Sequence, residues 1–196
     1  WLIQLLGTFE AFPQASIVGA KILDPLPYKQ LQFGDTNLGY VDEQQIRLTA
    51  KHTSEMDLGQ LDYIRPCLNV MGCCHLFKNE ALYDIGEFDV RFSPSQVDDI
   101  EHNLRGGLKG HQVVYNGFLE VVHHQKTGKQ SILSRAAKGN VDGNVIKMSS
   151  KYETAQAKQL KLQKEEESRQ FLRQCRRSLQ DAGLLNGVPE VPYDIF

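Results

Sequence analysis

The sequence predicts an α/β domain that is followed by a long C-terminal helix, and three observations lead to this prediction. Segments whose apolar residues recur at helical spacing alternate with short apolar runs that are typical of buried strands. A long polar segment near the C-terminus has a helix start signal at one end and a glycine at the other. With 196 residues, of which 41% are hydrophobic, the chain can bury the core of one or two domains.

The N-terminal part of the chain predicts a helix and then a strand. The apolar residues of Trp1–Phe12 recur at i, i+3 and i+4, which indicates a short amphipathic helix that ends before Pro13. The run Ile17–Leu23 is typical of a buried strand. Both elements leave apolar faces without partners from the N-terminal side, and the sequence begins at Trp1 rather than Met. We therefore expect a fragment of a longer protein or a processed product.

The next part of the chain predicts loops and broken strands. Gln32–Leu61 is polar and interrupted by glycines, so we expect a loop with irregular strand pieces. Asp62–Phe77 is a second strand region, interrupted at Gly72, where a glycine can relieve packing at a bulge. Asn79 is expected to cap a short helix over Glu80–Ile85, and the glycine that follows suits the end of that helix.

The segment Ile85–His124 contains a dense acidic cluster, Asp98-Asp99-Ile100-Glu101, at the start of a predicted helix that Ser95 caps. The helix is expected to bury one apolar stripe, formed by Val97, Ile100, Leu104 and Leu108. The carboxylates lie mostly outside this stripe. The helix is expected to end at the glycines Gly106, Gly107 and Gly110, and a strand is expected over His111–Tyr115.

Without further context, this segment has simple structural interpretations. The acidic cluster can be a solvated helix start in which Glu101 pairs with Arg105, a contact worth about a few tenths of a kcal/mol. The histidine pair 123–124 ends a strand, and such histidines are more often surface residues than metal ligands. Phe88 and Phe92 are most simply core aromatic residues.

The order of these residues resembles the second half of the catalytic domain of family 2 glycosyltransferases. The shared pattern is Gly86-x-Phe88-Asp89-x-x-Phe92, then Asp98-Asp99-x-Glu101, Arg105, Gly110 and a Val-rich strand that ends in His123. Upstream, Trp1-Leu2, Ile17–Leu23 and Val70–Phe77 are similar to further runs of the family, so the resemblance covers Trp1 to His124. It implies the mixed-sheet, GT-A type fold of nucleotide-diphospho-sugar transferases, with this chain as the acceptor-side half.

The resemblance implies the transfer of a sugar from a nucleoside-diphosphate sugar to an acceptor hydroxyl, with inversion. This chemistry needs a base for the acceptor proton and a cation that neutralises the departing diphosphate. By resemblance, Asp99 is the catalytic base, and Asp98, in place of the family's usual Glu, is a catalytic and substrate-binding residue. His123 matches the strand-end histidine that can complete the shell of Mn²⁺ or Mg²⁺.

Other parts of the family's site are only partly represented. Gly72 matches the glycine that lets the sugar nucleotide approach the backbone, and Glu101, in place of the usual Asp, is expected to give structural support by holding Arg105. The family's nucleotide-binding half, with its Asp-x-Asp motif, has no counterpart in the sequence. We therefore expect the chain alone to be inactive and to bind Mn²⁺ or Mg²⁺ weakly, because one histidine and a distant carboxylate are too few ligands.

Composition limits the partners. With 22 Lys and Arg against 24 Asp and Glu, the net charge of -2 argues against a nucleic-acid-binding protein. No apolar run approaches the roughly 20 residues of a membrane-spanning helix, and no signal peptide is evident. We expect a cytoplasmic protein, with the membrane periphery as an alternative, whose partners are a nucleotide-sugar donor and a hydroxyl acceptor. The donor sugar, the acceptor and the pathway cannot be read from the residues.

The C-terminal part predicts a loop over Gln125–Met148 and then a helix over Lys151–Ala182, opened by a capping box of Ser150 with Glu153. The predicted division is therefore 1–148 for the catalytic half-domain, 149–183 for the helix and 184–196 for an extended tail. The helix is polar in its first half and has an apolar stripe in its second half: Phe171, Leu172, Cys175 and Leu179. We expect the second half to dock on a monomeric domain and the first half to project, with a homodimer through 151–182 as the alternative.

Two rival functions remain open at this point. The first is a non-catalytic interaction module with the same fold, which acts through the long helix while the acids are only structural. The second is a small zinc-binding protein built on Cys67, Cys73, Cys74 and His75, although the cysteines are more simply free thiols in a reducing compartment.

Overall fold

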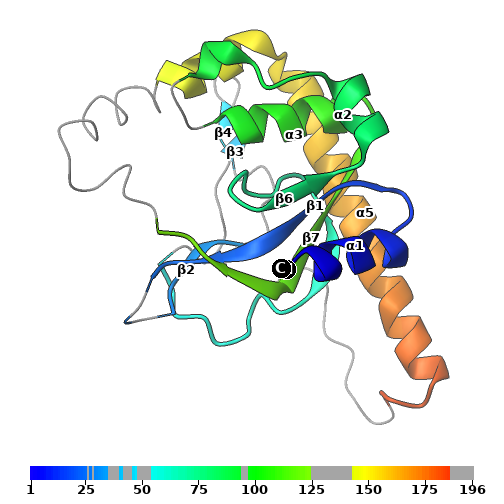
Figure 1. Ribbon diagram of the computed structural model, residues 1–196. Helices are drawn as coiled ribbons and strands as arrows, with labels where there is room; N and C mark the ends of the chain where they lie inside the picture. Colours follow the sequence, from blue (N-terminus) through cyan, green and yellow to red (C-terminus); the bar gives the residue numbers. More distant parts are fainter. Residues whose placement is uncertain are drawn as a thin grey trace.

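The computed structural model describes residues 1–25, 27, 29–34, 40–41, 46–47, 54–93, 97–124 and 143–185. A mixed, curled sheet lies in the middle of the molecule, with α2 (Asn79–Ile85) and α3 (Asp98–Leu108) above it, α1 (Leu2–Ala11) beside it and α5 (Thr154–Asp181) along one side (Figure 1). The predicted α/β class and the long C-terminal helix are confirmed.

The main sheet has five strands in the order β2-β1-β7-β5, and β6 also pairs with β1. β1 runs parallel to β7, whereas the β1–β2, β1–β6 and β5–β7 pairs are antiparallel. The strands are β1 (Ala15–Leu23), β2 (Leu31–Phe33), β5 (Ile64–Cys67), β6 (His75–Phe77) and β7 (Gln112–Val122). Two short strands, β3 (Tyr40–Val41) and β4 (Ile46–Arg47), form a separate antiparallel pair.

The central strand β1 is buried on both faces, as its apolar run predicts. Because side chains alternate along a strand, Ile17 and Leu23 belong to one core cluster, while Val18 and Ile22 belong to the cluster on the other face. Leu5 of α1 (Leu2–Ala11) joins the second cluster. The sheet is therefore the layer around which both cores form.

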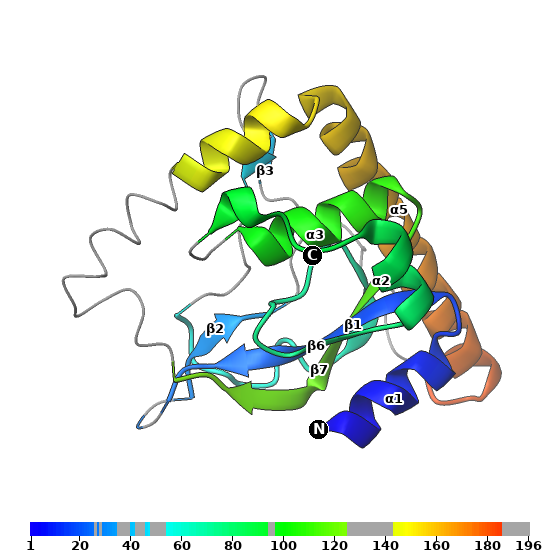
Figure 2. The ribbon, with the colours of Figure 1, turned by 45° about the horizontal axis from the view of Figure 1, so that its top comes forward.

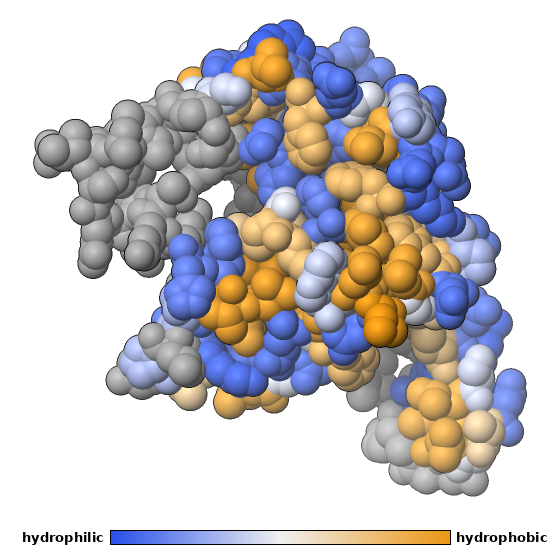
Figure 3. Space-filling model, viewed as in Figure 1, coloured by the Kyte–Doolittle hydropathy of each residue, from blue (hydrophilic) through white to orange (hydrophobic). Residues whose placement is uncertain are grey.

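Helix α1 ends before Pro13 as predicted, but its apolar stripe is only partly buried. Leu5 is fully buried, whereas Leu2 and Leu6 remain 42% and 48% exposed. Figure 3 shows apolar surface gathered over α1.

The helices on the opposite side of the sheet are α2 (Asn79–Ile85), the 3-10 turn η1 (Val90–Phe92) and α3 (Asp98–Leu108). The predicted cap of α2 is wrong, because Lys78, not Asn79, precedes the helix. α3 begins after Val97. Ser95 lies outside the described residues. The glycine expected to end α2, Gly86, has the positive φ that favours glycine, 87°.

Gly106 and Gly107 do not end α3 as predicted; they lie inside it and are buried. A Cβ atom at Gly106 would lie 2.9 Å from the side chain of Ile85, and one at Gly107 would lie 3.0 Å from Leu160. Their small size therefore lets neighbouring helices approach α3 closely. The helix ends after Leu108, which is 37% exposed, and the following strand β7 is longer than predicted.

The predicted loop before the long helix is wrong in its last part, because residues 143–151 are helical. Ser150 lies inside this helix, where its hydroxyl donates to the carbonyl of Ile146, so it does not form the predicted capping box. The long helix α5 (Thr154–Asp181) begins after Glu153. The predicted domain boundary after residue 148 falls inside the helical segment 143–151.

The two halves of α5 are buried in the opposite way from the prediction. Its first half packs on α3 and the neighbouring core through four buried side chains: Ala157, Leu160, Lys164 and Ser168. Its second half extends past the sheet, where Leu179 is 43% exposed (Figures 1 and 2). Phe171 still contacts Phe12, at 5.3 Å between ring centroids.

This burial predicts the hydrogen exchange of α5. Amides from Ala157 to Ser168 should exchange slowly, because opening this part exposes buried side chains and the core of α3. Amides from Gln174 to Asp181 should exchange much faster, because only partly buried or exposed side chains hold that end. Peptide-resolved exchange mass spectrometry measures both, and uniform protection along α5 would show that a second molecule covers its end.

Candidate functional site

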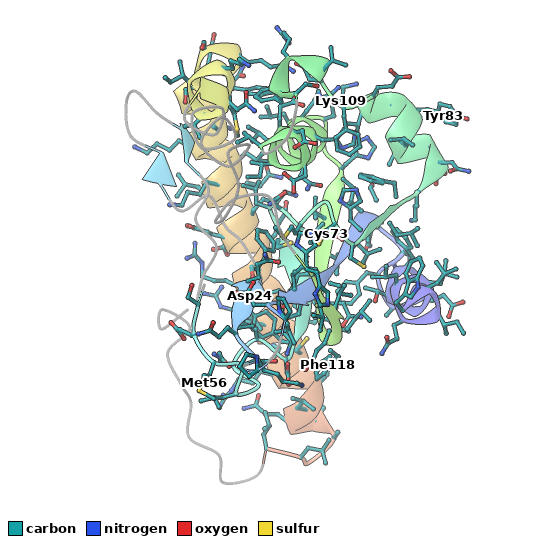
Figure 4. The ribbon with its side chains drawn as sticks, turned by 60° about the vertical axis from the view of Figure 1, so that its left-hand side comes forward. Asp24, Met56, Cys73, Tyr83, Lys109 and Phe118 are labelled. Carbon is teal, nitrogen blue, oxygen red and sulfur yellow. The ribbon has the colours of Figure 1, made fainter. Side chains whose placement is uncertain are left out.

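A cleft of about 550 Å³ opens between the start of α3, the turn after β5 and the ends of β2 and β7. We call it the acidic cleft; its lining residues are Phe33, Met71, Gly72, Cys73, His75, Phe88, Val97, Asp98, Asp99, Ile100 and His123. Figure 4 shows Cys73 between α3 and the sheet. Four residues predicted for one site, Gly72, Asp98, Asp99 and His123, therefore line one cavity.

Asp99 is held in place by two backbone amides. Its Oδ2 accepts a hydrogen bond from the amide of Gly72 at 2.8 Å, and its Oδ1 accepts one from the amide of Ile100 at 2.8 Å. A Cβ atom at Gly72 would lie 2.9 Å from Cβ of Asp99, so only glycine lets this turn approach the helix start so closely. Gly72 lies in a turn, not in a strand, and its observed neighbour is Asp99.

Burial raises the pKa of Asp99, and the charge of Asp98 adds to that rise, while the amides of Gly72 and Ile100 partly oppose it. A carboxylate with a raised pKa is a stronger base than an ordinary aspartate, and partial burial keeps water from returning this pKa to its ordinary value. Asp99 is therefore suited to take a proton from a hydroxyl group in the acidic cleft.

His123 directly follows β7 and lines the acidic cleft. Its Nδ1 lies 2.9 Å from Oε1 of Gln32, a carbonyl oxygen that can only accept, so Nδ1 carries the proton. In the neutral ring, the other nitrogen, Nε2, has the free lone pair and can bind a metal or accept a hydrogen bond. His124 is exposed.

The described residues fit a divalent cation in the acidic cleft only in part. Asp98, Asp99 and His123 line the cleft, but no three ligand atoms among them lie within 4.8 Å of one another. Mg²⁺ commonly takes one or two carboxylates from the protein and its other ligands from water and phosphate oxygens. A cation here therefore fits with a diphosphate present and fits poorly without one.

Within the described part of the chain, one set of three ligand atoms does converge, at Asp57, Asp62 and Glu120. Nζ of Lys21, whose side chain is fully buried, already lies among them, at 2.8 Å, 2.5 Å and 3.2 Å from these carboxylates. Burial opposes the charge of Lys21, but the three carboxylates outweigh it and raise the pKa of the ammonium group. The set is an ion-pair network around a lysine.

The rival zinc site is contradicted, because Cys67, Cys73, Cys74 and His75, all described residues, do not bring three ligand atoms together. Cys67 is buried and donates to the carbonyl of Asn69, and burial raises the pKa of its thiol to about 12. The described cysteines are free thiols, as expected.

An aromatic wall that the sequence did not predict forms one side of the acidic cleft. Phe88 stacks on His102, with 4.5 Å between ring centroids, and lies parallel to His75 at 6.1 Å. Phe88 is 38% exposed and is not the core residue that was predicted, whereas Phe92 is buried as predicted. Burial and the neighbouring His102 lower the pKa of His75 to about 4, so the ring is neutral at pH 7.

Glu101 does not lie off the buried stripe of α3 as predicted, because its carboxylate is fully buried. Its Oε1 lies 3.1 Å from Nε of Arg105, one turn along the helix.

Among the described residues, no helix is long and apolar enough to cross a membrane.

The chain is similar to the O-antigen biosynthesis protein RfbC of Myxococcus xanthus, at 26% identity over 134 residues. The similarity covers 67% of this chain and 10% of that protein, so the chain spans about a tenth of the relative's length. No family model matches the chain.

The sequence could have indicated some of the cleft residues that it missed. Cys73 follows Gly72, and a glycine that approaches the site brings its neighbour to the same wall. Phe33 gave no signal, because its strand lies at the edge of a segment that is polar and rich in breakers.

Proposed function

We propose that the chain is part of a family 2-like glycosyltransferase that takes part in polysaccharide biosynthesis, and that the acidic cleft is its acceptor site. The observation that carries this proposal is that Asp98, Asp99 and His123, which are in the order of the family motif, line one cleft. The similarity to an O-antigen biosynthesis protein supports the pathway class, since O-antigens are polysaccharides.

In the proposed reaction, an acceptor hydroxyl lies beside Asp99, which takes its proton as the oxygen attacks the anomeric carbon of the donor. The raised pKa of Asp99 favours this proton transfer, and the amides of Gly72 and Ile100 keep the carboxylate aimed into the cleft. Asp98 contacts the substrate from the neighbouring position. A single displacement of this kind inverts the configuration of the anomeric carbon.

The proposal includes Mn²⁺ or Mg²⁺, which His123 Nε2 and a cleft carboxylate would hold together with the diphosphate of the donor. Such a cation supplies Lewis-acid neutralisation of the departing diphosphate.

A non-catalytic interaction module is the second candidate, and the exposed end of α5 favours it. Leu179, near the end of α5, is 43% exposed, and Leu184, in the turn that follows the helix, is 69% exposed. This end of α5 extends past the sheet (Figure 1).

The two candidates are separated by an assay of the full-length protein. It is incubated with a panel of nucleoside-diphosphate sugars, hydroxyl acceptors and Mn²⁺ or Mg²⁺, and glycosylated product is measured by mass spectrometry. We expect product with at least one donor and its loss when the metal is chelated. Absence of product across the panel, with a partner protein bound through α5, would favour the module.

A further inference from the structure

The carboxylate of Glu101 connects α3 to the C-terminal part of the chain. It lies in the first turn of α3, as Asp98 and Asp99 do, and it is fully buried. Lys151 Nζ lies 2.8 Å from its Oε1, and the hydroxyl of Tyr152 donates to the same oxygen. A buried carboxylate is costly unless charges and donors surround it, so these contacts and Arg105 fix where Glu101 can lie.

The segment 143–152 also holds the chain that precedes α3. Lys151 Nζ lies 2.7 Å from Oδ2 of Asp89, at the start of η1. Asn144 is fully buried and donates from Nδ2 to the carbonyl of Phe92 at 2.8 Å. The same short helix therefore holds both η1 and α3, as their positions in Figure 2 show.

Packing extends this connection to the residue directly before the acidic pair. Val97 has φ = 75°, a left-handed conformation that β-branched residues rarely adopt. It is 6% exposed and packs in one cluster with Met148 and Leu160, from the segment 143–152 and from α5. Such a conformation persists only where the surroundings enforce it, so these C-terminal side chains help to hold the start of α3.

We propose that the segment 143–152 is a positioning element for Asp98 and Asp99, which acts through Lys151, Tyr152 and the buried Glu101. The inference rests on the proposed function of the acidic cleft and deepens it. Asp99 and Glu101 belong to one rigid helix, so a turn of α3 about its axis that displaces Glu101 would also move Asp99 away from the amide of Gly72. Since catalysis depends on placement to within about 1 Å, loss of these contacts should lower turnover without removing any group from the cleft.

The test uses the full-length protein with Tyr152→Phe and Lys151→Met, and with Lys151→Arg as the conservative variant. Tyr115→Phe is the matched control, because it also removes a buried tyrosine hydroxyl bond, to the carbonyl of Leu61, in a core cluster other than that of Val97 and Met148. We expect Tyr152→Phe and Lys151→Met to lower kcat about 10- to 100-fold at nearly unchanged KM for the donor. Lys151→Arg should restore most of kcat, and Tyr115→Phe should leave it within about twofold.

A second readout does not need activity. The amide proton of Gly72, which donates to Asp99, is followed by NMR hydrogen exchange in the same variants, and loosening of α3 should speed its exchange. If the wild-type protein transfers no sugar, the proposed function fails, while this exchange still tests the positioning. Unchanged exchange and unchanged kcat in Tyr152→Phe and Lys151→Met, relative to Tyr115→Phe, would overturn the inference.

Discussion

Asp99→Asn in the full-length protein is expected to lower sugar transfer by about 10²–10⁴-fold, the usual cost of losing a general base. Asparagine keeps the size of the side chain and one oxygen for the amides that now bind Asp99, but it cannot take a proton. The folded state should change little, because burial already penalises the charge that the substitution removes. Steady-state transfer rates and a thermal melt measure the two effects.

The neighbouring carboxylate provides the control for this variant. Asp98→Asn should lower the rate less than Asp99→Asn, and a reversed order would mean that Asp98 is the base. In the wild type, the rate should fall as the pH drops through the raised pKa of Asp99, since the protonated carboxyl is no longer a base. Near-normal turnover of Asp99→Asn would end its assignment.

Lys21→Met is expected to have the largest effect on stability. It removes the buried ammonium group that lies between Asp57, Asp62 and Glu120, and leaves three carboxylates close together. Removing one partner of a buried ion pair costs roughly 3–5 kcal/mol, and the lower end applies here because Asp62 and Glu120 are partly exposed. Urea unfolding of the two proteins at pH 7 measures this loss.

The pH dependence of that loss follows from the shifted pKa values. Burial tends to raise the pKa of Asp57, but the hydrogen bonds from Lys21 and the amide of Gly59, together with the charges of Lys21 and Lys29, outweigh it and lower the pKa. The ionised carboxylate therefore stabilises the fold at pH values above the ordinary aspartate pKa, and this effect is lost as the pH falls. The difference between Lys21→Met and the wild type should therefore shrink at acidic pH. Lys29→Met, at the exposed lysine that also pairs with Glu120, should change stability much less. Equal losses in both variants would show that burial is not the cause.

The elements that were predicted well are those whose own residues determine them. The apolar run of β1 and the helical spacing in α3 specify a buried strand and an amphipathic helix wherever they are placed. Asp98, Asp99 and His123 could be assigned to one site only because their order matches a family pattern. Nothing in their spacing brings β7 to the start of α3.

The errors share a physical cause, which is that tertiary packing overrides local signals. Gly106 and Gly107 carry a helix-ending signal, yet they serve as close-contact points against Ile85 and Leu160. The first half of α5 has a polar sequence, although Lys164 buries its aliphatic stem. The polar pattern therefore led to the wrong prediction of which half of the helix docks on the domain.

The helical segment 143–151 was missed for a related reason. Its polar residues and the glycine at position 143 are typical of a loop. Val145, Met148 and Tyr152 nevertheless recur at helical spacing and pack against the core of α3, so a period analysis limited to these apolar residues would have found it. The partners of Lys21 gave no local signal, because they come from two distant parts of the chain.

The configuration of the transferred sugar tests the central claim most directly. The full-length protein is given a nucleotide sugar of known anomeric configuration, and the anomeric configuration of the glycoside product is determined by proton NMR. Asp99 acting as a base in a single displacement predicts the inverted anomer, formed in step with release of the nucleoside diphosphate. A product that retains the configuration of the donor would contradict the account, because retention requires a different reaction path from direct attack by a hydroxyl that Asp99 activates.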